Sequence, residues 1–574
     1  MTDDELLPLR AILGELAPQR RAALLPALHA AQQLHGWLSE PVASEVSRAL
    51  GVPLADVYGV IEFYEMFNRQ PVGRTILRVC SAPVCALAGA DAATQALCQH
   101  LKVEPDEVTA DGAFIVEHAP CLGLCDRAPA ALAGETAVGQ INPAQAAALC
   151  TSKAEKPRSF VGGDIRILTI NCGQGHPTSL TDYRARGGYG GLKKALTMTP
   201  QAVLAEVKAA GLVGRGGAAF PTGVKWEGAA AAPGQPKYVV CNADESEPGT
   251  FKDRILMEED PQRVIEGMII AAHAVGASRG YIYVRGEYPE AFKMMSAAVA
   301  EARHAGIVGA NIFASGLQFD IEMRLGAGAY ICGEETALLE SIEGKRGLPR
   351  IKPPFPTTHG LFGKPTIINN VETFCNVPLI LERGAGEYRK IGTERSPGPK
   401  LFCVSGQIQK PGLYEVPFGV TLRHLLFDLA GGLRQGRKLQ AVLMGGAAGA
   451  FATEKDLDVI LSFEDLRAAD LPLGSGAVMV FDDSADLRDV LKRLAHFFAD
   501  ESCGKCYPCQ LGARRQSEIL DRSAAGGSLT GDRERLADIG TTMIDASLCG
   551  LGQTAPTAIL SAMKLWPELF KAKQ

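Results

Sequence analysis

The stretch Gly211–Arg254 constrains the fold more than any other part of this chain. It reads GLVGRGGAAFPTGVKW and then, after a short insertion, YVVCNADESEPGTFKDR. Its glycines let the backbone approach a ligand closely, and successive amide N–H groups can then face an anion. Residues 238–241 read as a buried strand that ends in the acidic run 242–247, and ligands of open α/β sheets sit just beyond strand C-termini. The stretch predicts a site for a phosphate-bearing cofactor, although a flexible surface loop would explain a glycine-rich segment that stood alone.

Strands and helices alternate beyond this stretch, which predicts an α/β layer on a largely parallel sheet. We expect helices over 264–275 and 290–304 and strands over 280–285 and 319–324. A second glycine-rich turn, GAGAYICGEET, follows the last strand and opens a helix over 337–343. The later segment 369–373 carries amides, which both donate and accept and so suit the edge of a flavin or nicotinamide.

Composition excludes several classes of function. At 574 residues the chain is long enough for three or more domains. A formal net charge of −6 gives no reason to expect nucleic-acid or polybasic membrane binding. No apolar run reaches the roughly 18–20 residues that span a bilayer, and the N-terminus MTDDELLPLR is acidic where a signal peptide is basic. We therefore expect a cytoplasmic protein.

The chain has fifteen cysteines, and eight of them fall into spaced groups, which in a cytoplasmic protein favours metal sites over disulfides. The first group consists of Cys80, Cys85, Cys121 and Cys125. Its pairs follow expected strands over 76–79 and 113–117, with a helix over 91–101 between them, an order typical of a thioredoxin-like layer. Two pairs of thiolates can hold a two-iron cluster. Zinc is the competing interpretation, although structural zinc more often uses Cys-x2-Cys knuckles.

The second group lies in a helical region near the C-terminus, where a helix is expected over 487–499. It consists of Cys503, Cys506, Cys509 and the distant Cys549. Three thiolates at Cys-x2-Cys-x2-Cys with a remote fourth are the usual ligands of a 4Fe–4S cluster, whereas zinc would commonly use two separated pairs. Seven further cysteines are scattered singly and are interpreted as small buried apolar side chains: Cys98, Cys150, Cys172, Cys241, Cys332, Cys375 and Cys403.

These motifs resemble two subunits of the NADH-oxidising module of respiratory complex I, found also in NAD-reducing hydrogenases and formate dehydrogenases. Residues 1–150 are similar to the thioredoxin-like 2Fe–2S subunit, including a helical preamble whose last helix we expect from Leu54 to about Phe67. The chain from about 166 onward is similar to the flavin- and NADH-binding subunit. The resemblance implies a multidomain α/β protein: 1–150 helical bundle plus thioredoxin-like 2Fe–2S domain, 151–165 linker, 166–395 FMN- and NADH-binding α/β domain, 396–485 β-grasp domain, and 486–574 helical 4Fe–4S domain.

The resemblance also carries binding residues over to this sequence. Its flavin contacts fall on Gly214, Gly216, Lys225, Asn242, Asp244, Glu245, Tyr330, Gly333, Glu334, Asn369, Asn370 and Thr373. Its nicotinamide-nucleotide contacts fall on Phe220, Glu247, Glu335, Lys352 and Phe355, with Glu335 near the nicotinamide. Ala219 stands where the family usually has glycine. No general acid or base is expected, because hydride transfer to a flavin needs none from the protein.

The implied cofactors are FMN, a 2Fe–2S cluster and a 4Fe–4S cluster, with NAD(H) as substrate. Such a chain converts between two-electron and one-electron carriers. Fusion of both family units in one chain is a feature of NAD-reducing hydrogenases and of some soluble formate dehydrogenases. Between these we expect the NAD(H)-oxidoreductase (diaphorase) subunit of a molybdenum- or tungsten-dependent formate dehydrogenase. The alternatives are the corresponding subunit of an NAD-reducing hydrogenase or of complex I, and, in another class, a non-catalytic assembly scaffold.

Overall fold

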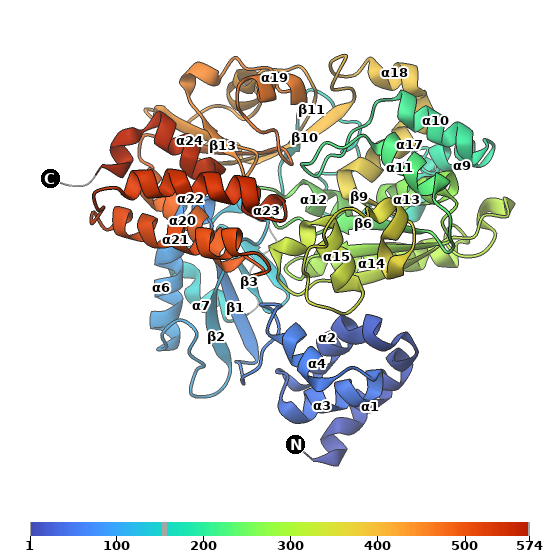
Figure 1. Cartoon of the computed structure of the whole chain (residues 1–574), viewed down its shortest axis with the longest axis horizontal. Coiled ribbons are helices and arrows are strands. Elements are labelled where there is room, and N and C mark those ends of the chain that lie inside the picture. The colour runs from blue at the N-terminus through green and yellow to red at the C-terminus, as the bar shows by residue number, and fades with distance from the viewer. Residues whose placement is uncertain (1, 152–157, 572–574) are drawn as a thin grey trace.

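The computed structural model describes residues 2–151 and 158–571, and Figure 1 shows the parts of the chain meeting around a central region. The N-terminal part is helical, as predicted: α1 (Asp3–Leu16), η1 (Ala17–Ala23), α2 (Leu24–His35), α3 (Glu40–Leu50) and α4 (Leu54–Ile61). The expected helix to Phe67 is wrong, since α4 ends at Ile61. The backbone N–H groups of Glu65 and Met66 instead donate to the carbonyl oxygens of Gly328 (3.1 Å) and Ala327 (2.9 Å). These contacts tie the bundle to the second glycine-rich turn.

The thioredoxin-like part has a four-stranded sheet in the order β2-β1-β3-β4. Its strands are β1 (Thr75–Cys80), β2 (Phe114–Ala119), β3 (Ala130–Ala133) and β4 (Thr136–Gly139). Strand β1 pairs with β2 in parallel, which confirms the predicted β-α-β order. The helices are α5 (Pro83–Leu87), α6 (Ala90–Leu101), η2 (Cys125–Arg127), η3 (Pro143–Gln145) and α7 (Ala146–Leu149).

The next part is built on a four-stranded sheet in the order β8-β7-β6-β9, and every pairing in it is parallel, as predicted. The strands are β6 (Tyr238–Ala243), β7 (Arg279–Val284), β8 (Asp320–Leu325) and β9 (Thr366–Asn370). Because the strands are parallel, their carboxyl ends meet at one edge of the sheet.

Helices before, between and after these strands complete this part of the chain. They are α8 (Leu180–Ala185), α9 (Gly190–Leu196), α10 (Pro200–Ala209), α11 (Thr222–Ala231), α12 (Lys252–Glu259), α13 (Pro261–Val275), α14 (Pro289–His304), η4 (Ile312–Ala314), η5 (Tyr330–Gly333), α15 (Glu335–Ile342), α16 (Pro356–His359), η6 (Leu361–Gly363), α17 (Val371–Arg383) and α18 (Ala385–Arg389).

A six-stranded sheet in the order β13-β12-β14-β10-β11-β5 forms the β-grasp part. Its strands are β5 (Val161–Gly162), β10 (Pro399–Gly406), β11 (Gly412–Pro417), β12 (Leu439–Met444), β13 (Ala450–Ala452) and β14 (Ala477–Asp482), and its helices are η7 (His424–Leu429), η8 (Glu454–Asp456) and α19 (Phe463–Ala468). Strand β5 comes from the segment 151–165 that we expected to be a linker, and it pairs with β11. Residues 152–157 of that segment lie outside the described residues.

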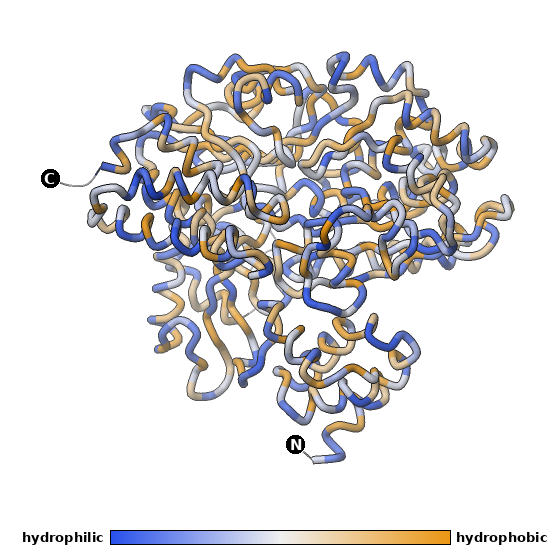
Figure 2. The backbone as a smooth tube through the Cα atoms, viewed as in Figure 1, coloured by the Kyte–Doolittle hydropathy of each residue, from blue (hydrophilic) through white to orange (hydrophobic). Residues whose placement is uncertain are grey.

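The C-terminal part is helical: α20 (Leu487–Asp500), α21 (Tyr507–Ala524), α22 (Asp532–Ala546), α23 (Gly550–Thr554), α24 (Thr557–Leu565) and η9 (Pro567–Phe570). One apolar core runs continuously through all parts, and a second lies within the β-grasp sheet. Figure 2 shows polar and apolar residues interleaved along the helices. In the portion that the structure describes, no helix has the length and apolarity needed to cross a membrane.

Candidate functional site

A cavity of about 750 Å³ lies at the carboxyl edge of the parallel sheet. The loop 216–219, the acidic run after β6, the turn at η5 and Asn370 at the end of β9 all line it. These segments approach one another closely. A Cβ atom added to Gly216 would lie only 3.1 Å from Cβ of Asn370. The side chain of Asn242 joins the two glycine-rich turns by donating to the carbonyl of Gly333 (2.8 Å). The structure therefore brings together the segments that the sequence analysis selected.

Eight of the residues predicted to contact a flavin line this cavity: Gly216, Asn242, Asp244, Glu245, Tyr330, Gly333, Glu334 and Asn370. The other four stand behind its wall. Asn369 accepts a hydrogen bond from the Trp226 indole (2.8 Å), and the Thr373 hydroxyl accepts one from the backbone N–H of Arg215 (2.9 Å). The backbone N–H of Gly214 donates to Phe220 (2.9 Å), which closes the glycine-rich loop.

The fourth of these, Lys225, belongs with the predicted nicotinamide-nucleotide residues. Its Nζ lies 3.3 Å from Glu335, whose other oxygen accepts from Lys352 at 3.0 Å. Burial raises the pKa of Glu335, but the two lysines outweigh it and hold that pKa below its ordinary value. Phe220 and Phe355 leave 51% and 55% of their surface exposed. Of the five residues predicted to contact the nicotinamide nucleotide, only Glu247 lines the cavity.

Ala219 adopts a φ of +52°, in the left-handed region that glycine enters freely. An alanine there costs about 1–2 kcal/mol. Ala219 thus has a backbone conformation that favours glycine, the residue that the resemblance leads us to expect there.

Three carboxyl groups of the acidic run are kept from ionising fully by their surroundings. Burial raises the pKa of Asp244 and of Glu245 to about 8 and that of Glu247 to about 7. Glu245 accepts hydrogen bonds from the first backbone N–H groups of α12, at Asp253 (2.9 Å) and Arg254 (3.0 Å). Glu247 accepts from the Tyr330 hydroxyl and from the backbone N–H of Ala448 (2.7 Å). This wall of the cavity can therefore exchange protons near neutral pH.

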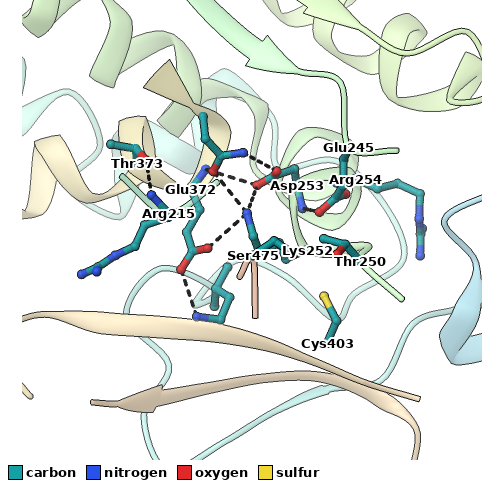
Figure 3. A network of polar contacts seen from close by, with 12 residues as sticks. Arg215, Glu245, Thr250, Lys252, Asp253, Arg254, Glu372, Thr373, Cys403 and Ser475 are labelled. Carbon is teal, nitrogen blue, oxygen red and sulfur yellow. Dashed lines mark hydrogen bonds and ion pairs between the residues drawn. The ribbon is translucent and has the colours of Figure 1, made fainter. Parts of the chain in front are cut away.

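A buried ionic network lies beneath the cavity (Figure 3). It joins the β-grasp part to the part of the chain built on the parallel sheet, which we call the flavin-type layer. Nζ of Lys252 is 2.7 Å from Asp253, 3.2 Å from Asn370 and 3.2 Å from Glu372. Burial lowers the pKa of Lys252, but the carboxylates outweigh it and raise that pKa above its ordinary value. Lys252 and Glu372 are both fully buried. The contacts of Lys252 therefore hold Asp253 and Asn370 in the cavity wall.

The β-grasp part enters the same network through Lys400 on β10. Its Nζ donates to Glu372 (2.8 Å) and to the carbonyl of Ser475 (2.9 Å), and Ser475 lines the cavity. Burial lowers the pKa of Lys400 to about 8, although Glu372 opposes that shift. Sequence analysis missed Lys252, Asp253 and Lys400 as site residues. The first two lie inside the quoted motif NADESEPGTFKDR, whereas no sequence signal marks Lys400.

The four thiols of the first cysteine group are buried, each at most 2% exposed: Cys80, Cys85, Cys121 and Cys125. The sulfurs of Cys121 and Cys125 are 3.9 Å apart, and the neighbouring thiols of Cys121 and Cys85 raise the pKa of Cys80 above its ordinary value. Two thiolates on one tetrahedral metal with bonds of about 2.3 Å lie about 3.8 Å apart. These residues therefore fit a thiolate-bound cluster.

Two arginines of the flavin-type layer hold the loop of this first group. Arg285 donates to the carbonyl of Cys121 (2.6 Å), and Arg254 donates to that of Gly123 (3.0 Å). Arg285 also donates to the carbonyl of Glu245 (2.8 Å), next to the cavity. The 2Fe–2S part is thus attached directly behind the acidic wall of the cavity.

The second cysteine group surrounds one small cavity, which Cys503, Cys506, Cys509 and Cys549 line together with four apolar residues, Ser502 and Lys505. Among the described residues, no three or more His, Cys, Asp or Glu side chains converge as around a single metal ion. A cluster differs, because its thiolates bind different irons around an inorganic core. Four cysteines around one pocket fit such a cluster. Ile331 and Leu551 line this pocket and also the large cavity, so the two sites are neighbours.

The scattered cysteines are also placed as expected, with one exception. Six of the seven are buried, and Cys150 is partly exposed. The cysteines of residues 2–151 and 158–571 are all free thiols.

This site combines grouped thiolates that can bind iron with a cavity for a phosphate-bearing cofactor. That combination is typical of iron–sulfur flavoprotein oxidoreductases, and comparisons with known proteins agree with this class. Family models match residues 9–153 (thioredoxin-like [2Fe-2S] ferredoxin), 207–379 (Nuo51 FMN-binding domain) and 489–573 (NADH-ubiquinone oxidoreductase-F iron-sulfur binding region). The chain belongs to the family of NADH-quinone oxidoreductase subunits that carry the Nuo51 FMN-binding domain. It is an NADH dehydrogenase-type oxidoreductase subunit with binding domains for FMN, a 2Fe–2S cluster and a 4Fe–4S cluster.

Three similar proteins define the extent of this match. The NADP-reducing hydrogenase subunit HndC of Solidesulfovibrio fructosivorans is 49% identical over 71% of this chain and 83% of its own. An NADH-quinone oxidoreductase subunit of Rhizobium meliloti is 48% identical over 70% of this chain and 95% of its own. A chain in the crystal structure of air-oxidised NAD+-reducing [NiFe]-hydrogenase is 34% identical, with a TM-score of 0.85, over 96% of this chain and 94% of its own.

Proposed function

We propose that this chain exchanges hydride between NAD(H) and FMN held in the 750 Å³ cavity and passes single electrons toward the Cys503 cluster. When bound, FMN accepts a hydride and releases electrons singly, and iron–sulfur clusters carry single electrons. The observation that supports this route is that Ile331 and Leu551 line both the cavity and the cysteine pocket. One layer of side chains therefore separates the two sites.

We assign the binding roles as the sequence analysis predicted them. The eight cavity-lining residues would hold FMN, with Gly214, Lys225, Asn369 and Thr373 supporting the wall. Phe220 and Phe355 are exposed aromatic rings that can stack on a base, and Lys352 is paired with Glu334 (2.9 Å) and Glu335. The eight cysteines would bind the two clusters. The protein's part in the reaction is to orient the dinucleotide and to exclude water, with no proton donor required.

We further propose that the chain works in the cytoplasm with a catalytic partner subunit, a molybdenum- or tungsten-dependent formate dehydrogenase. The fusion of both family units in one chain supports this assignment. A hydrogenase partner is the second candidate, because the chain from the NAD+-reducing [NiFe]-hydrogenase matches the fusion over 96% of this chain. Affinity purification through this chain, followed by NAD+ reduction with formate and with H2, distinguishes them. Reduction with H2 alone would overturn the formate assignment.

The first prediction is that the isolated, FMN-loaded chain reduces ferricyanide or a viologen dye with NADH. The nicotinamide, flavin and cluster sites all lie in this one polypeptide, so no partner is needed for the dye reaction. Dye reduction is followed by absorbance, and an FMN-depleted sample is the control. A loaded sample that oxidises NADH no faster than the depleted one would contradict the proposed hydride exchange.

The second prediction is that Glu247→Gln raises the ratio of NADPH to NADH efficiency about tenfold at about pH 8, where Glu247 with its pKa of about 7 is mostly charged. We place Glu247 near the adenosine ribose, where a carboxylate accepts hydrogen bonds from the ribose diol and repels the extra phosphate of NADPH. A like-charge contact costs about 1–3 kcal/mol in a partly desolvated site. The kcat/KM values for both dinucleotides, measured at low ionic strength, give the ratio, and an unchanged ratio would mean that another residue sets the preference.

The same carboxylate gives a pH signature that serves as the control for this prediction. Burial raises the pKa of Glu247 to about 7, so the group is neutral below that pH and charged above it. The NADPH-to-NADH ratio of the unmodified protein should therefore rise as the pH falls from about 8 to about 6. Since the phosphate of NADPH also titrates near pH 6, Glu247→Gln reports that contribution alone and should show a flatter profile.

A further inference from the structure

The β-grasp part contributes an entire side of the cavity wall, through α19 and the loop that follows it to Ser475. Acidic and basic residues are very unequal in number on this wall. Among the described residues that line the cavity, six are carboxylic acids and one is a cation, Arg467 on α19. The acids are Asp244, Glu245, Glu247, Asp253, Glu334 and Asp470.

This balance is a problem for the ligands of the site, because FMN and NAD(H) both carry phosphate groups. Burial keeps Asp244, Glu245 and Glu247 partly neutral, but each of the six acids that is ionised repels a phosphate in a partly desolvated cavity. The backbone N–H groups of the glycine-rich loop offset part of this repulsion. The nearby lysines are already engaged, Lys252 with Asp253 and Glu372 and Lys225 with Glu335.

Arg467 differs from those lysines because its guanidinium has no ion-pair or hydrogen-bond partner within the described part of the chain. Its neighbour Asp470 does not neutralise it and faces Lys564 of the C-terminal part at 3.7 Å instead. A guanidinium presents a planar set of donors that matches phosphate oxygens. Arg467 is therefore a cation at the cavity wall whose donors are all available.

We propose that Arg467 binds a phosphate group of a ligand in this cavity, which makes the β-grasp domain part of the binding site and not only a support. This assignment rests on the proposed function, since FMN and NAD(H) are the phosphate-bearing ligands. The phosphate is either that of FMN or the pyrophosphate of the dinucleotide, and both sources share the same chemistry.

The test compares Arg467→Gln with Arg423→Gln, a control in the same domain. Arg423 pairs with Asp458 on the surface, 48% of its side chain is exposed, and it does not line the cavity. FMN-depleted protein is titrated with FMN and with riboflavin, which lacks the phosphate. The KM for NADH is then measured at saturating FMN. Arg467→Lys, which keeps the charge, should lose less than Arg467→Gln.

If Arg467 binds the FMN phosphate, Arg467→Gln should weaken FMN binding about tenfold and leave riboflavin binding unchanged. If it binds the pyrophosphate, the KM for NADH should rise about tenfold with FMN binding intact. No change in either measurement, or an equal loss for FMN and riboflavin, would overturn the proposal. The comparison of FMN with riboflavin measures binding and does not depend on NADH oxidation. A failure of the proposed hydride exchange would instead appear as absent dye reduction by the unmodified protein.

Discussion

Replacing Cys506 with alanine should abolish the electron paramagnetic resonance signal of one cluster and stop electron delivery to the partner subunit, while NADH still bleaches the flavin. The physical reason is that, in the proposed route, hydride exchange involves only the large cavity, whereas the electrons leave through the cysteine pocket. Cys506 lines that pocket with Cys503, Cys509 and Cys549, and it does not line the large cavity. A 4Fe–4S cluster needs all four thiolates.

Two measurements on the purified complex separate these steps. Stopped-flow absorbance with NADH reports flavin reduction, and NAD+ reduction by the substrate of the partner subunit reports the complete route. Cys150→Ala is the matched control, because Cys150 is a partly exposed thiol outside both groups. Normal turnover in Cys506→Ala would show that electrons leave the flavin by another route.

Replacing Lys252 with methionine should lower the free energy of unfolding by about 3–5 kcal/mol and weaken FMN binding. The methionine would leave Asp253 and Glu372 buried without their central cation. Lys252 is fully buried and touches both carboxylates, as Figure 3 shows. Lys400 would still face Glu372, but it lies on the β-grasp side and does not reach Asp253 by any ion pair among the described residues. Asp253 lines the cavity, so its displacement also disturbs the ligand.

The matched control is Lys208→Met, which removes an exposed ion pair of the same layer. Lys208 lies 2.7 Å from Glu227, and about half of each side chain is exposed (47% and 52%). Surface pairs of this kind contribute about 0–1 kcal/mol. The thermal midpoint for FMN release, followed by flavin fluorescence, compares the two variants. Equal midpoints for Lys252→Met and Lys208→Met would show that the network does not stabilise the site.

Much of the architecture was predictable because its signals are local. Three strands of the parallel sheet (β6, β7 and β8) were predicted to within one or two residues, since short apolar runs bounded by glycine or acidic residues mark them, whereas β9 was not predicted as a strand. The eight grouped cysteines were found from their spacing alone. The helix expected to continue to Phe67 failed for a non-local reason, as the backbone of Glu65 and Met66 hydrogen bonds to a turn more than 250 residues away.

The site was predicted less completely than the fold. Motifs identified the glycine-rich turns and the acidic run, and the resemblance supplied roles for individual residues, which remain predictions. Neither signal indicated that Ser475 and Arg467 of the β-grasp part line the cavity. That part carries no ligand-type motif of its own, because its contribution consists of single residues on α19 and on the loop that follows it.

By itself, the sequence determined which chemical groups this protein has: two sets of four thiolates, two glycine-rich turns at strand ends and an acidic run. Such patterns depend on residues close in the chain, where spacing dictates geometry. Only the tertiary structure decided how the groups relate to one another. It placed Ile331 and Leu551 between the cavity and the cysteine pocket, and it buried Lys252 against Glu372, 120 residues further along the chain. Those contacts form because separate domains pack through one continuous core, and no local pattern encodes the packing of one domain on another.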